Sequence, residues 1–178
     1  EECLFDDFTV LYIPEEIKTP EEQGIYKEFL NKEKPYDFIF GHGVIQESMV
    51  MASLMMTKRE LTATTHIFHV KDLEESTKGY CIFGHYHVHT MISEKVFYVG
   101  SYSRFKFGEE KEKGWMEISR ENGLYNQEFV VNSFAPIYNT ITLSAQSIEQ
   151  FTREITTLEE EFSKNPENHY KIKLEISD

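Results

Sequence analysis

Three histidines in this chain occupy positions from which their imidazoles could bind a metal ion. The residues Ile39-Phe40-Gly41-His42 recur as Ile82-Phe83-Gly84-His85, and the second copy continues to His87. Each copy follows a short run of strand-forming residues, so each histidine is expected just beyond a buried strand. Sheet proteins commonly bind ligands at such strand ends. Imidazole is a usual ligand of zinc, manganese and iron, so His42, His85 and His87 are the candidate metal ligands.

The spacing of these residues supports a shared site. His85 and His87 are two residues apart, so in an extended segment they point to the same side and could serve one ion or two neighbouring ions. Gly41 and Gly84 allow the backbone to turn sharply and to come close to a ligand. A single Gly-His pair would be interpreted as an ordinary strand-end histidine bonded to the backbone. The repeat favours metal ligands. His89 continues the alternation, but nothing else distinguishes it.

A candidate phosphate site follows the apolar run Val96–Val99. The segment Gly100-Ser101-Tyr102-Ser103-Arg104 combines a glycine, hydroxyls and a guanidinium at a strand end. These groups can hold a phosphate through backbone N–H groups and a charged fork of donors. Ser101 and Arg104 are therefore candidate phosphate ligands. A polar turn without a ligand is the alternative, and for this segment alone it is the simpler interpretation.

The elements that must position these residues alternate between strand and helix. Strands are predicted at Phe8–Ile13, Tyr36–Phe40 and Tyr80–Phe83. Between the first two, Thr19-Pro20 is a good helix start and an apolar stripe extends to Asn31. Met49–Leu61 also has helical character. This order predicts a mixed α/β (α+β) fold.

The later part of the chain has mainly strand signals and then a β-α-β pattern. A short strand is predicted at Thr65–Val70, a helical turn at Asp72–Thr77 and two strands within Thr90–Gly100. A hairpin is predicted across Asn122-Gly123, a strong turn signal. Pro136 marks a possible boundary. The pattern beyond it predicts a strand at Ile137–Leu143, an amphipathic helix at Ser147–Ser163 and a strand at Tyr170–Ile176.

The composition limits the partners and the location. The chain has 178 residues, with 18 basic against 31 acidic residues and a formal charge of -13. This charge argues against broad electrostatic binding to nucleic acid, although it allows a local groove or a metal-bridged phosphate. No apolar run approaches the roughly 20 residues of a membrane helix, which excludes a helical membrane span. Two cysteines, Cys3 and Cys81, form no disulfide framework, and this predicts a cytoplasmic protein with a buried free thiol at Cys81.

In order and spacing, several motifs resemble the second half of a calcineurin-like metallophosphoesterase, and they are closest to the SbcD-type DNA repair and recombination nucleases. The matching residues are Gly41-His42, Gly84-His85-Tyr86-His87, Tyr98-Val99-Gly100-Ser101 with Arg104, and Gly114-Trp115-Met116. Phe8–Pro14 also resembles the strand that precedes the first Gly-His motif there. The resemblance covers most of the chain, and Gly-His-x-His is fairly specific to the superfamily.

The resemblance implies two packed, mostly antiparallel or mixed sheets with helices outside. Residues 1–135 would form the C-terminal half of the metallophosphoesterase domain, and residues 136–178 would begin a small β-α-β capping domain that helps to hold DNA. It also implies a site for two manganese ions, with magnesium, iron or zinc as alternatives. His42 and His85 would bind one ion and His87 the other. Arg104 has no matched metal role.

The implied activity is metal-dependent hydrolysis of a phosphodiester. The resemblance implies a DNA exonuclease or endonuclease subunit in an SbcCD-type repair complex or a phage replication and recombination complex. Such a subunit works with an SMC-like ATPase and dimerises through the half that has no match here. A phosphodiesterase acting on cyclic nucleotides or other small diesters is an alternative within the superfamily. A non-catalytic assembly or binding module, with structural histidines, is the alternative from another class.

The chain departs from the family pattern at its start. The Asp-x-His, Gly-Asp-x-x-Asp and Gly-Asn-His-Asp motifs do not occur, and the adjacent pair Asp6-Asp7 matches none of them. These motifs supply the bridging carboxylate, further ligands and the histidine that protonates the leaving group, so no catalytic residue is assigned. The chain also lacks an initiator Met. We therefore expect a C-terminal fragment of a longer protein, inactive by itself.

Overall fold

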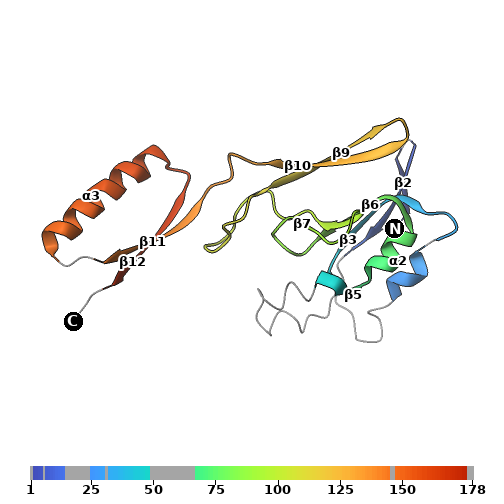
Figure 1. Ribbon diagram of the computed structural model, residues 1–178, viewed down its shortest axis with the longest axis horizontal. Helices are drawn as coiled ribbons and strands as arrows, with labels where there is room; N and C mark the ends of the chain where they lie inside the picture. Colours follow the sequence, from blue (N-terminus) through green and yellow to red (C-terminus); the bar gives the residue numbers. More distant parts are fainter. Residues whose placement is uncertain are drawn as a thin grey trace. The chain divides into compact units, whose positions relative to one another are not determined.

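A computed structural model gives the positions of residues 2–5, 7–14, 25–30, 32–48, 67–144 and 147–175, which are the described residues. The chain forms two compact units. Unit 1 comprises Glu1–Ser101 and Trp115–Phe129, and unit 2 comprises Tyr102–Gly114 and Val130–Asp178. Helices and several sheets occur in these residues, which confirms the α+β class (Figure 1). Within the described ranges, no helix is long and apolar enough to cross a membrane.

Unit 1 is built on a six-stranded mixed sheet with the order β1-β2-β3-β6-β8-β7. Its strands are β1 (Glu2–Phe5), β2 (Phe8–Ile13), β3 (Tyr36–His42), β6 (Thr77–Gly84), β7 (Thr90–Met91) and β8 (Val96–Tyr98). The four central strands are parallel, and β1 and β7 pair antiparallel at the edges. The carboxyl ends of β3 and β6 therefore lie at the same edge of the sheet, as the repeated motif requires.

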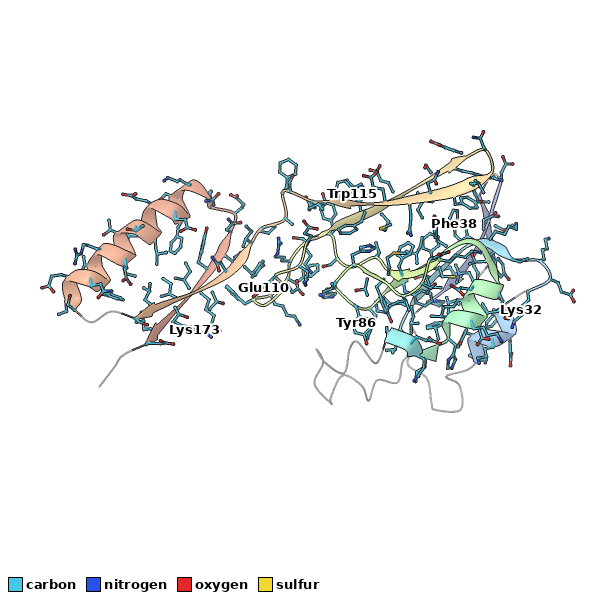
Figure 2. The ribbon with its side chains drawn as sticks, in the orientation of Figure 1. Lys32, Phe38, Tyr86, Glu110, Trp115 and Lys173 are labelled. Carbon is cyan, nitrogen blue, oxygen red and sulfur yellow. The ribbon has the colours of Figure 1, made fainter. Side chains whose placement is uncertain are left out.

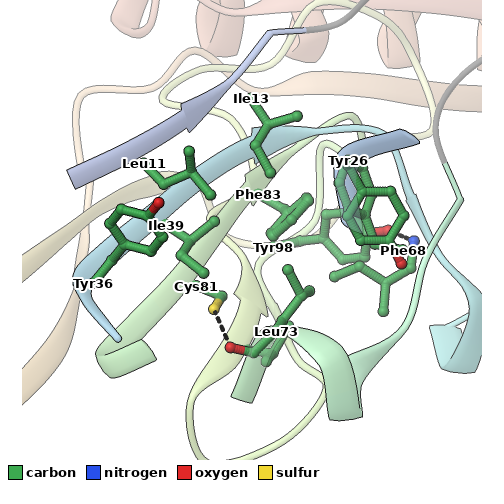
Figure 3. Close-up of a cluster of buried hydrophobic side chains, with 12 residues drawn as sticks. Leu11, Ile13, Tyr26, Tyr36, Ile39, Phe68, Leu73, Cys81, Phe83 and Tyr98 are labelled. Atoms are coloured by element: carbon green, nitrogen blue, oxygen red, sulfur yellow. Dashed lines mark hydrogen bonds between the residues drawn. The ribbon is translucent and has the colours of Figure 1, made fainter. Parts of the chain in front are cut away.

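One face of this sheet carries the hydrophobic core of unit 1. The strand register places Leu11, Ile39, Cys81 and Val96 in one row across this face. Short elements cover it: the 3-10 helix η2 (Ile25–Phe29), β5 (Ile67–Phe68), paired with β4 (Val44–Ile45), and α2 (Val70–Glu75). They contribute the buried side chains Tyr26, Phe68 and Leu73 (Figure 3). The Cys81 thiol donates to the Leu73 carbonyl at 3.6 Å, so the predicted buried free thiol is confirmed.

The other face of the sheet is partly covered by a hairpin of β9 (Gly114–Glu121) and β10 (Leu124–Val131). The ring of Tyr125 packs on Phe38 with the centroids 5.0 Å apart and on Phe8 at 6.4 Å. Figure 2 labels Phe38 on the sheet and Trp115 on the hairpin. Asn122 and Gly123 both take positive φ, 51° and 82°, which confirms the predicted tight turn.

Asp37 ties three strands together beneath the hairpin. Its Oδ2 accepts from the Thr9 N–H at 2.8 Å and from Thr9 Oγ1 at 2.7 Å, and its Oδ1 accepts from the Tyr125 hydroxyl at 2.8 Å. Lys78 Nζ lies 3.5 Å from Oδ1. Burial alone would raise the pKa of this carboxyl, but the bonds from Thr9 and Tyr125 and the charge of Lys78 outweigh it and lower the pKa to about 2.

Unit 2 contains the predicted β-α-β pattern. It consists of β11 (Tyr138–Ser144), α3 (Ile148–Lys164) and β12 (His169–Glu175), and the two strands pair in parallel. Ser147 caps the helix by accepting from the Gln150 N–H at 3.1 Å. The predicted boundary at Pro136 lies inside this unit, which also includes Tyr102–Gly114.

Other predictions fall partly or wholly outside the described residues. Of the helix predicted from Thr19 to Asn31, the described part is η2 and Leu30, and the helix predicted at Met49–Leu61 lies outside entirely. The strand predicted at Thr65–Val70 corresponds to the short β5, and the predicted helical turn corresponds to α2. The 3-10 helix η3 (Gln46–Ser48) and strand β1 had no sequence prediction.

We predict that Asp37→Asn lowers the free energy of unfolding at pH 7 by about 2 kcal/mol, the linkage value of its shifted pKa. Because the folded state lowers this pKa, the contribution is complete above the unfolded value of 3.8 and is lost as the pH falls towards 2. Urea unfolding at pH 7 and pH 3 measures both effects. The exposed Glu121→Gln is the control, and an equal cost for the two variants would refute the prediction.

Candidate metal centre

The two Gly-His motifs lie side by side on β3 and β6 and are offset by one residue, an arrangement that we call the interlock. In the register of these strands, Gly41 lies opposite Phe83 and His42 lies opposite Gly84. A Cβ on Gly41 would lie 2.5 Å from the Phe83 ring, and a Cβ on Gly84 would lie 2.5 Å from Cδ2 of His42. Each glycine therefore makes room for the aromatic ring of the neighbouring strand.

This interlock brings two of the three predicted metal ligands together. The ring centroids of His42 and His85 are 5.5 Å apart, and the rings are nearly perpendicular, at 87°. With metal–nitrogen bonds of about 2.1 Å, two imidazoles that share one ion at a roughly tetrahedral angle have centroids about 5 Å apart. The separation of this pair therefore fits one shared ion.

His85 holds its place in an unusual backbone conformation. Its φ is 106°, in a region that side-chain-bearing residues rarely adopt. The Tyr86 ring packs against it with the centroids 5.1 Å apart, and Tyr86 in turn contacts Tyr98 at 4.6 Å. Such strain persists only where the surroundings enforce it, and it is concentrated at functional sites. The conformation of His85 therefore marks this turn as a candidate site independently of its residue type.

The hydroxyl of Tyr98 positions the loop that follows His42. It accepts from the Ile45 N–H at 2.7 Å and donates to the Gly43 carbonyl at 3.1 Å. Ser48 Oγ lies 3.4 Å away. Tyr98 is fully buried, and this burial raises its pKa to about 12, so the hydroxyl keeps its proton and can donate.

His87, the third predicted ligand, is exposed and does not complete a cluster. Because His85 leaves the extended conformation, the spacing of two residues no longer places His85 and His87 on one side. Among the described residues, no group of three or more His, Cys, Asp or Glu side chains could hold a metal ion. Neither His87 nor a described carboxylate therefore joins the pair His42 and His85.

The two predicted phosphate ligands belong to different units. Ser101, in unit 1, donates through Oγ to the His87 carbonyl at 3.3 Å. Arg104, in unit 2, donates to the carbonyls of Glu109, Ala135 and Pro136 at 2.9, 3.2 and 3.3 Å. These bonds give Arg104 a role in holding loops of its own unit. A phosphate contact from either residue stays a prediction.

His89 has a clear place in the fold that its sequence position did not reveal. Its Nδ1 lies 3.0 Å from the Tyr98 carbonyl, and its ring stacks on Phe129 with the centroids 4.4 Å apart and an angle of 4°. Burial lowers its pKa and favours the neutral ring. His89 therefore connects the sheet to the hairpin strand β10, and it lies outside the candidate metal pair.

An open hollow of about 520 Å³ lies beside His42, between the sheet and the base of the hairpin. The side chains that line it are mostly apolar, and three are partly exposed aromatic rings: Tyr12, Phe40 and Trp115. Sequence reasoning missed this hollow. The one indication of it in the sequence was that Tyr12 and Phe40 directly follow the core residues Leu11 and Ile39. Because successive side chains of a strand point to opposite faces, this order places Tyr12 and Phe40 on the face away from the core.

No protein-family model matches the chain, and no curated protein matches it in sequence.

We predict that substitution of the two glycines has different effects: one changes the position of the His42 ring, and the other lowers the stability of the fold. Gly84→Ala should displace the His42 ring and leave stability nearly unchanged, because the ring can rotate. Gly41→Ala should lower the free energy of unfolding by about 1–3 kcal/mol, because the Phe83 ring is enclosed by the core. NMR of the histidine rings and urea unfolding measure the two effects. An unmoved His42 signal in Gly84→Ala would disprove the interlock.

Tyr98→Phe should loosen the loop after His42. The change leaves the buried Ile45 N–H without its acceptor, at a cost of about 1–3 kcal/mol. We expect faster hydrogen exchange at the Ile45 amide than in the wild type. Tyr80→Phe is the matched control, since the Tyr80 hydroxyl donates to the Tyr125 carbonyl at the hairpin instead. Unchanged exchange at Ile45 would contradict this role of Tyr98.

Proposed function

We propose that this chain contributes two metal-binding histidines to a metal-dependent phosphodiesterase with DNA as its substrate class. The observation that carries the proposal is the convergence of His42 and His85 at the carboxyl ends of two parallel strands, with the rings 5.5 Å apart. The family resemblance of the motifs supplies the reaction. The strained φ of His85 supports a functional role for this turn.

His42 and His85 would hold a first-row divalent ion, and manganese is the one that the resemblance implies. The chemistry of such an ion is stabilisation of charge on a phosphate and activation of a water. The chain's own contribution is to fix the ligands: Gly84 leaves space for the His42 ring, and Tyr98 holds the loop behind it. In the proposed enzyme, His87 binds a second ion.

Two neutral imidazoles bind a divalent ion less tightly than a site that also has carboxylates, because they do not offset its charge. The motifs that supply carboxylate ligands in the family that the chain resembles do not occur in this sequence, so we propose that a segment carrying those motifs provides them. The isolated chain then binds an ion weakly and turns over no substrate efficiently. A DNA-holding role for the β-α-β segment, an SMC-like ATPase partner and a cytoplasmic location belong to the same proposal.

The proposal predicts selective binding of Mn²⁺ at the histidine pair. Substoichiometric Mn²⁺ should broaden the ring NMR signals of His42 and His85 at lower concentration than those of His169 in unit 2, because paramagnetic relaxation acts at short range. His85→Ala should remove the selective effect at His42. His169→Ala is the matched control and should leave it unchanged. Equal broadening of all histidines would overturn the metal site.

Activity is tested in a longer protein that carries the carboxylate motifs. There, His85→Ala should reduce Mn²⁺-dependent DNA cleavage by about a hundredfold or more, since even the supporting partners of metal ligands contribute about 10–100-fold. Wild-type cleavage by this variant would sink the proposal. A preference for a small chromogenic diester over DNA would favour the small-substrate phosphodiesterase instead.

A further inference from the structure

The aromatic hollow beside His42 has the features of a site for a flat ring. Tyr12 and Phe40 are register partners on the parallel strands β2 and β3, whose backbones lie about 4.8 Å apart, so both side chains leave the same face of the sheet. They are 49% and 37% exposed, and Trp115 on β9 is 37% exposed. Three large aromatic side chains thus present accessible surface around one hollow. Aromatic rings of this kind are the usual platforms on which nucleobases stack.

The remaining lining favours a neutral, planar group. Ile82, Val99, Met116 and Ile118 supply aliphatic surface. Among the lining residues that the structure describes, only His42 has an ionisable group other than a tyrosine hydroxyl. None of the described lining residues is acidic. The volume of about 520 Å³ lies within the usual range of small-ligand pockets, roughly 300–1,000 Å³. The hollow is therefore suited in size and polarity to a heteroaromatic base.

The Trp115 ring is held in a defined orientation at this hollow. Its Nε1–H donates to Glu117 Oε1 at 3.0 Å on the same strand. Glu117 itself does not line the hollow. A ring that is fixed before binding loses little freedom when a ligand stacks on it. Trp115 is also the single tryptophan of the chain, so its fluorescence reports on this hollow alone.

The position of His42 identifies the class of ligand. Its ring belongs to the candidate metal pair, with its centroid 5.5 Å from that of His85, and it also lines the hollow. A ligand with a phosphodiester at the pair would therefore place an attached group in the hollow, and an apolar flat group attached to a phosphodiester is a nucleobase. We propose that this hollow binds an unpaired nucleobase next to the phosphate, so that the protein recognises a single-stranded or frayed end. The proposal rests on the proposed function for its phosphate.

The test is fluorescence titration of the 178-residue chain without metal and with a chelator present. The probe is a short oligothymidylate, and the reference is an abasic oligonucleotide of the same length, which keeps the phosphates and removes the bases. We expect saturable quenching of Trp115 by the oligothymidylate and at least tenfold weaker apparent affinity for the abasic strand. Equal quenching by both strands, or none by either, would overturn the proposal.

Two variants locate the binding. Phe40→Leu keeps an apolar side chain but removes the ring, and it should weaken binding of the oligothymidylate about tenfold, in line with the contribution of one stacked base. Phe29→Leu is the matched control, because Phe29 is an exposed phenylalanine of the same unit that does not line the hollow. Equal binding by wild type and Phe40→Leu would overturn the assignment, with circular dichroism confirming that both variants fold.

The outcome is separable from that of the proposed function. Base-dependent quenching in the absence of metal, together with a failure of Mn²⁺ to bind the histidines, would support the nucleobase site and refute the proposed phosphodiesterase. Mn²⁺ binding without base-dependent quenching would be consistent with the proposed phosphodiesterase and would refute the nucleobase site.

Discussion

The candidate site depends on how closely β3 and β6 approach each other at their carboxyl ends. Two glycines, each opposite an aromatic ring of the neighbouring strand, allow this approach, and any larger residue at Gly41 or Gly84 would force the ring away. The same contact serves two layers. On the core face it seats Phe83 against Phe68, with the centroids 4.7 Å apart, and on the other face it seats His42 beside His85. Core packing and the placement of the two candidate metal ligands are therefore set by one local arrangement.

Two residues outside the Gly-His motifs also hold β3 in place through hydrogen bonds. Tyr98 comes from β8, two strands away from β3, yet its hydroxyl bonds both sides of the turn after His42. Asp37 does the equivalent at the opposite end of β3, where it accepts from β2 and from the hairpin. The strand that carries His42 is thus fixed at both ends by buried polar groups, each satisfied by several partners. Networks of this kind favour one arrangement of the strands over nearby alternatives.

The sequence was sufficient for those features that local patterns determine. The strands β2 and β3, the Asn122-Gly123 turn and the β-α-β segment follow from alternation, turn chemistry and helix periodicity, and all of them are present. The repeated motif predicted that the three histidines converge, and the structure brings two of them together, with the ring centroids of His42 and His85 5.5 Å apart. The prediction that His85 and His87 point to the same side assumed an extended chain, and the positive φ of His85 departs from that conformation. A metal-binding role for His87 stays a prediction. The hydrogen-bonding roles of Tyr98 and Asp37, and the hollow, were not predicted because they depend on register between strands far apart in sequence, which no local pattern encodes.

The division into two units has a topological consequence. The chain passes from one unit to the other between residues 101 and 102, between 114 and 115, and between 129 and 130. Three covalent crossings differ from the single linker that joins most neighbouring domains, because no single peptide bond is the sole tether. Cleavage by a protease at any one crossing would leave the units connected through the other two. On a denaturing gel such a nick would be visible, while under native conditions the nicked protein would still migrate as one particle.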